Sequence, residues 1–165
     1  MVPSRSLRPI VALLLSVSAI VAIVSAYLSL AKSEEKRISY VADICSRIDQ
    51  ASRLGAGGPE KVSSLMRQAT RKYGAGAYGV VIRGFDALDR VGNETARAET
   101  RSFLLSPIPG VRLMAIGRVT HNRDRDAIPA LLNLAEDKNE SVRQEAIRAL
   151  KRLRDEEAKA DARPR

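Results

Sequence analysis

The sequence predicts an all-α fold built from repeated helical hairpins. One helical pattern occurs twice, 31 residues apart, and both copies place small and branched apolar residues at the same steps: Val111, Ala115, Ile116 and Val119, then Val142, Ala146, Ile147 and Leu150. The aromatic content is 4%, without tryptophan, and this composition favours close-packed helices over a sheet. Repeated helix pairs bury their apolar faces by stacking on their neighbours, so the pattern indicates an extended binding surface rather than a catalytic pocket.

The chain begins with a basic N-terminus, residues 1–9, and an apolar segment follows it. Residues 10–31 carry no charge, and 22 residues are enough to span a bilayer. We therefore expect a transmembrane helix or signal anchor there, in a single-pass protein with a cytoplasmic N-terminus and its soluble part outside, periplasmic in a bacterium. Secretion after signal cleavage is the alternative, because residues 24–26 and 29–31 each resemble a cleavage site.

Residues 32–58 are expected to form a juxtamembrane amphipathic helix that ends in a glycine-rich hinge. Its apolar stripe is spaced by three and four residues and consists of Ile38, Val41, Cys45 and Ile48. The stripe is short for a coiled coil, so packing onto the next domain as a capping helix is favoured over self-association. Gly55 to Pro59 then interrupts the helix, and Pro59 suits the first turn of the next one.

Residues 59–154 are predicted to form about three helical hairpins. A fainter copy of the repeated pattern lies in residues 79–91, where Gly84, Phe85 and Leu88 precede Ala115, Ile116 and Val119 by 31 residues. The preceding helix of each hairpin is expected at residues 60–72, 94–105 and 127–135. Ser141 and Gln144 have the spacing of a capping box for the last helix. The charged tail, residues 155–165, is expected to be disordered.

Residues 127–153 resemble a HEAT repeat, particularly the short bacterial type that also occurs in phycobilisome lyase-like proteins. Their sequence is AIPALLNLAEDKNESVRQEAIRALKRL. Residues 110–126 resemble the second half of another repeat. The resemblance implies a short α-solenoid used for protein interaction. It also implies that Asp137 and Arg143, six residues apart, form a structural ladder between neighbouring repeats. Ser106 stands six residues before Arg112, where the family would have Asp, so we expect an incomplete ladder.

The sequence offers little for catalysis or metal binding. The chain has one histidine, His121, and one cysteine, Cys45, whereas a zinc site needs several such ligands and a serine nucleophile needs a base. The glycines of residues 74–79 match GxGxxG, but they follow a helical segment rather than a strand and therefore predict an interhelical turn. We expect no catalytic residue, no cofactor and no metal site.

The leading functional hypothesis is a non-enzymatic, membrane-anchored scaffold that binds another protein. The net charge of +9 favours an acidic partner. Polar positions on the repeated helices are the expected partner-binding residues: Arg112, Arg118, Arg143 and Arg148. The resemblance permits a chromophore lyase-like or chaperone-like protein as an alternative. A nucleic-acid-binding module is a second alternative, but no nucleic acid is expected because acidic residues interrupt the basic ones. The sequence does not indicate an oligomeric state.

Overall fold

The computed structural model describes the backbone of residues 7–55 and 57–161 and the side chains of residues 22–55 and 57–156. Within these residues every regular element is helical. The α-helices are α1 (Leu7–Ala51), α2 (Gly58–Tyr73), α3 (Tyr78–Val91), α4 (Glu94–Ser102), α5 (Pro109–His121), α6 (Ile128–Leu134) and α7 (Glu140–Asp161). Short 3-10 turns lie between them: η2 (Gly74–Ala77), η3 (Phe103–Leu105) and η4 (Arg125–Ala127). The predicted all-α class is confirmed.

The chain divides into two compact units, Met1–Tyr40 and Val41–Arg165. The first unit contains most of α1, and its described large apolar side chains, Ile23, Val24, Tyr27, Leu28, Leu30 and Ile38, are exposed. A search of the described residues finds no helix that is long and apolar enough to cross a membrane. The first part of the predicted span, residues 10–21, lies outside the residues whose side chains are described.

The second unit begins with the last turns of α1. Ile44, Ile48 and Ala51 are fully or almost fully buried there. Asp49, on the same turns, accepts two hydrogen bonds from Arg83 of α3. Of the predicted stripe, Ile48 is buried and Val41 and Cys45 are half-buried, whereas Ile38 is 65% exposed and the buried Ile44 was not predicted. The structure also joins the predicted membrane and juxtamembrane helices into the single helix α1.

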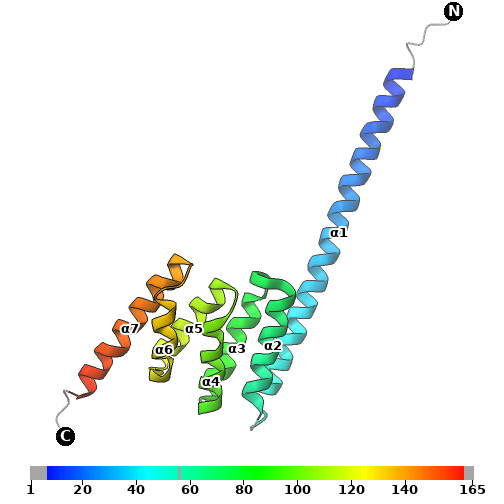
Figure 1. Cartoon of the computed structure of the whole chain (residues 1–165). Helices are drawn as coiled ribbons and strands as arrows, with labels where there is room; N and C mark the ends of the chain where they lie inside the picture. The colour runs from blue at the N-terminus through cyan, green and yellow to red at the C-terminus, as the bar shows by residue number, and fades with distance from the viewer. Residues whose placement is uncertain (1–6, 56, 162–165) are drawn as a thin grey trace, which may run out of the picture. The chain divides into compact units, whose positions relative to one another are not determined.

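The rest of the second unit consists of three helical hairpins, α2–α3, α4–α5 and α6–α7, which follow one another in chain order (Figure 1). Successive hairpins touch through corresponding helices, since α2 packs on α4, α3 on α5, and α5 on α7. Two sets of residues at 31-residue steps are buried in all three hairpins: Gly84, Ala115 and Ala146, and Leu88, Val119 and Leu150. The three predicted hairpins are thus present.

One repeated position behaves differently in the last hairpin. Phe85 and Ile116 are at most 1% exposed, whereas Ile147, the third member of the series, is 49% exposed. Phe85 also meets Phe103 edge-on, with ring centroids 5.4 Å apart. The difference follows from stacking, because α3 and α5 each have a following helix against them and α7 does not among the described contacts.

Local sequence explains where the helices begin and end. Asn93 caps α4 by accepting a hydrogen bond from Ala96 N–H. Asn139 caps α7 in the same way through Val142 N–H, so the cap is Asn139 and not the predicted Ser141. The first four residues of the GxGxxG match form η2 between α2 and α3, where Gly74 has a φ of 53°, and the last two begin α3. Helix α7 continues to Asp161, so residues 155–161 are helical where the sequence predicted a disordered tail, and residues 162–165 lie outside the description.

Candidate protein-binding surface

Arg112 lies inside the repeat domain rather than on its surface. The residue is 5% exposed, and its Nη2 donates a hydrogen bond to Asp137 Oδ1 at 2.8 Å. Its Nη1 donates to the backbone carbonyl of Ser106, also at 2.8 Å. Arg112 thus joins its own hairpin, α4–α5, to the loop between α6 and α7. Since its guanidinium is enclosed by these contacts, Arg112 is not available to a binding partner.

The six-residue spacing in the sequence corresponds to a contact within one repeat. Arg143 Nη1 donates to the backbone carbonyl of Asp137 at 2.8 Å, which matches the bond from Arg112 to Ser106. The carboxylate of Asp137 faces the preceding repeat and bonds Arg112 instead. The contact between neighbouring repeats therefore joins Asp137 to Arg112 of the preceding repeat. Ser106 accepts the hydrogen bond from Arg112 with its backbone carbonyl, which any residue at this position could supply.

Hydrogen bonds hold the Asp137 carboxylate in its charged form. Burial alone would raise the pKa of Asp137, but the Asn139 N–H at 2.7 Å and the Arg112 guanidinium outweigh burial and lower that pKa. A hydrogen bond from Arg83 likewise lowers the pKa of Asp49. Both carboxylates are bound to arginines of neighbouring helices, so they contribute to the packing of the stack.

Arg118 is held by carboxylates of the preceding hairpin. Its two terminal nitrogens donate to Asp86 and Asp89 of α3, each at 2.7 Å. Asn122 adds a hydrogen bond to the other oxygen of Asp89. The side chain of Arg118 is half-buried. These contacts neutralise Arg118 across the α3–α5 contact and leave it little capacity for a partner.

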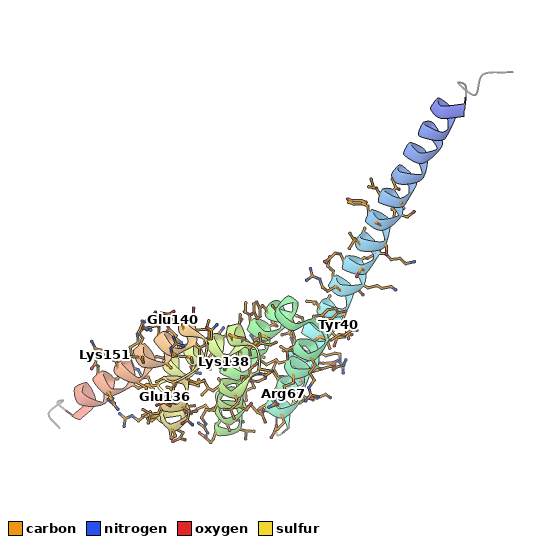
Figure 2. The ribbon with its side chains drawn as sticks, turned by 45° about the horizontal axis from the view of Figure 1, so that its top comes forward. Tyr40, Arg67, Glu136, Lys138, Glu140 and Lys151 are labelled. Carbon is orange, nitrogen blue, oxygen red and sulfur yellow. The ribbon has the colours of Figure 1, made fainter. Side chains whose placement is uncertain are left out.

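Helix α7 carries several exposed cations, among them Arg148, Lys151 and Arg152. Arg148 is 61% exposed in its side chain and pairs with Glu145 on the same helix at 2.9 Å. Lys151 projects from α7 (Figure 2). Neither Lys151 nor its neighbour Arg152 has a carboxylate partner among residues 22–55 and 57–156. Of the four predicted arginines, Arg148 is the one that the structure leaves exposed on this face, and Arg143 is intermediate in exposure.

A hollow of about 390 Å³ lies between α5 and α7 beside Arg152. Its lining defines the α5–α7 hollow: Gly117, Thr120, His121, Arg123, Arg152, Leu153 and Glu156. Gly117 and Thr120 stand 31 residues after Asp86 and Asp89, the carboxylates that hold Arg118. The acidic pair of the α3–α5 contact is therefore missing at the α5–α7 contact. Arg123 reaches Glu156 at 3.2 Å, and Arg152 has no carboxylate partner in the part of the chain whose side chains are described.

Sequence reasoning did not place Arg152 among the partner-binding residues and did not predict the hollow, although the sequence does show one feature of it. Alignment of α3 with α5 at the 31-residue step shows acidic residues at 86 and 89 and uncharged ones at 117 and 120. In the part of the chain whose side chains are described, no three His, Cys, Asp or Glu residues gather as they would around a metal ion. The α5–α7 hollow is basic, and its chemistry suits the binding of carboxylates.

A stack of helical hairpins joined between repeats by a largely buried arginine–carboxylate pair is an α-solenoid. Residues 103–164 match the family model of HEAT repeats, which supports a HEAT-repeat fold for this part of the chain. The match runs from η3 through α7 and leaves the α2–α3 hairpin outside. Comparisons with curated proteins and with solved structures gave no match. The likeness to the bacterial, phycobilisome lyase-like type stays a prediction.

Proposed function

We propose that the chain is a non-enzymatic scaffold whose HEAT repeats bind an acidic segment of another protein, and that residues 10–31 hold it at a membrane. The observation that carries the first part is the α5–α7 hollow. There Arg152 is exposed and has no carboxylate partner among the residues whose side chains are described, and Gly117 and Thr120 on the facing helix carry no charge. HEAT repeats generally bind other proteins, and the net charge of +9 favours an acidic one.

The chemistry of the hollow suits a carboxylate. A guanidinium presents a planar fork of donors from which a carboxylate can accept two hydrogen bonds, and the described residues offer no carboxylate to the fork of Arg152. Arg148 and Lys151 lie on the same helix and extend the positive surface. Because exposed charges at the edge of an interface mainly raise the association rate, we expect Arg152 to determine affinity and Arg148 to determine salt-dependent association.

Site-specific cross-linking tests this surface. A photoreactive amino acid at Thr120 of the full chain should capture a partner segment rich in Asp and Glu, identified by mass spectrometry. The substitution Arg152→Glu should abolish this capture. Lys61→Glu is the matched control, because Lys61 is an exposed α2 lysine outside the hollow and the charge change is the same. Capture that persists in Arg152→Glu would remove the α5–α7 hollow from the proposal.

The membrane part of the proposal rests on the sequence. Residues 10–31 are uncharged over a length that spans the hydrocarbon core, and the exposed apolar side chains of residues 23–30 fit a lipid environment. The full chain should remain with membranes after alkaline carbonate extraction, and a chain lacking residues 10–31 should be released. The mass of the mature protein distinguishes a retained anchor from a cleaved signal. Release of the full chain with its N-terminus intact would contradict membrane anchoring.

A further inference from the structure

A second hollow lies in the repeat domain between α2 and η3. It measures about 460 Å³, and its walls include Arg67 and Arg71 of α2 together with Phe103, Leu105 and Ile108. A neighbouring hollow of about 510 Å³ along α2 shares Arg67 and Arg71. We call this combined surface the α2–η3 groove. It shares no residue with the α5–α7 hollow.

Leu105 makes the groove apolar at its edge. Its exposure is 78%, whereas the other exposed large apolar residues described in Val41–Glu156 are between 46% and 49% exposed. Leu105 ends η3, and the next turn leads to Pro107 and Pro109, so the chain direction presents this side chain to solvent. Ile108 and the buried ring of Phe103 continue the apolar wall. An apolar side chain of this exposure gains from being covered by another apolar side chain.

Arg67 forms a fixed wall of the groove. Its guanidinium donates to Glu99 at 2.9 Å, to Ser102 at 3.0 Å and to Ser63 at 3.0 Å. It also lies 5.1 Å from the centre of the Phe103 ring. Figure 2 labels Arg67 on α2. Because these contacts link α2 to α4 and η3, the two sides of the groove are held together before any partner binds.

Arg71 supplies an unneutralised charge one helical turn further along α2. It is exposed, and it has no ion pair in the described residues. A free guanidinium beside an apolar patch favours a ligand that combines a carboxylate with a bulky apolar side chain. This combination separates the groove from the α5–α7 hollow, whose lining is mainly polar or charged.

We infer that the α2–η3 groove binds a short peptide segment in which a bulky apolar residue lies close to Asp or Glu. The apolar side chain packs on Leu105, Phe103 and Ile108. The carboxylate accepts hydrogen bonds from Arg71. Such a segment could belong to the partner captured at the α5–α7 hollow or to another protein, and the groove binds it independently of that hollow.

Selection from a displayed random-peptide library on the full chain tests this inference. The enriched peptides should carry a bulky apolar residue within a few positions of Asp or Glu. One enriched peptide, synthesised with a fluorophore, should bind about tenfold or more weakly to Leu105→Asp and to Arg71→Glu. Lys61→Glu, on the same helix and outside the groove, is the matched control and should leave binding unchanged.

Leu105 and Arg71 are both exposed, so these substitutions should leave thermal unfolding unchanged, and unfolding curves check this. Arg152→Glu should also leave peptide binding unchanged, which distinguishes the groove from the proposed α5–α7 function. No enrichment, enrichment of peptides lacking the acidic and apolar pair, or equal binding by the variants would overturn the inference. Self-association of the full chain that Leu105→Asp abolishes would overturn it in favour of a second copy.

Discussion

Asp137 accepts a hydrogen bond from Arg112 across the contact between two hairpins, with Nη2 and Oδ1 2.8 Å apart. The two side chains are only 7% and 10% exposed. Removing one partner of a buried pair leaves a charge without compensation, so Asp137→Ala and Arg112→Ala should each lower the free energy of unfolding by about 3 kcal/mol. Urea denaturation at neutral pH measures this change. Arg148→Ala, which breaks an exposed pair, should cost less than about 1 kcal/mol.

The stabilising effect of Asp137 should depend on pH. The folded state lowers its pKa, so its contribution is fully present above the ordinary carboxyl pKa of about 3.9 and is lost as pH falls through the lowered folded value. The full chain should therefore exceed Asp137→Asn in stability at pH 7, and the gap should close below about pH 4. Urea denaturation from pH 7 to pH 3 follows the gap. A gap that stays constant over this range would exclude titration of Asp137 as its source.

Equivalent positions in the repeats should differ in their tolerance of truncation. Ile116 is fully buried and Ile147 is 49% exposed, although the sequence pattern treats them alike. Ile116→Ala should cost about 2–5 kcal/mol because it removes buried methyl groups and leaves a cavity. Ile147→Ala should cost less than about 1 kcal/mol. Thermal and urea unfolding of the two variants test the difference, and equal costs would mean that Ile147 is covered in the protein.

The first turn of α5 should not accept a larger residue at Gly110. A Cβ added there would meet the hydroxyl of Tyr78 and approach its ring carbon Cζ to 2.6 Å. An aromatic ring cannot bend away as a flexible chain can, so Gly110→Ala should destabilise the protein by about 1–3 kcal/mol. Gly117→Ala on the same helix is the control, since nothing lies within 4 Å of the added atom. It should be neutral or stabilising by up to about 1 kcal/mol, because alanine favours the helix.

The helices of the repeat domain could be predicted because their apolar residues recur at a fixed step. The series through Gly84, Ala115 and Ala146 marks one buried face in three hairpins. On α1 the predicted stripe was right at Ile48, wrong at Ile38 and lacked Ile44, because period alone does not say which neighbour a short stripe meets. The N-cap of α7 was predicted at Ser141 from the spacing of a capping box, but the structure has it at Asn139. Asn93 caps α4 in the same way, and each asparagine is followed by Glu.

The surface was harder to predict than the helices. Arg112 and Arg118 look like exposed cations in the sequence, but each meets carboxylates about one repeat away, Asp137 at 25 residues and Asp86 at 32. Such contacts depend on how hairpins stack, and no local spacing encodes them. The α2–η3 groove was not predicted for the same reason. Leu105 follows the expected helical pattern, and it is exposed only because the chain turns in η3.

The shared use of Arg112 limits how the chain can be divided. Its guanidinium closes the turn before its own helix through Ser106 and also binds Asp137 beyond the next helix. A fragment that ends between α5 and α6 would cut no helix, but it would lack Asp137 and leave the buried Arg112 without its carboxylate. The α4–α5 and α6–α7 hairpins therefore behave as one cooperative block, and the smallest fragment that keeps this part of the stack intact contains both.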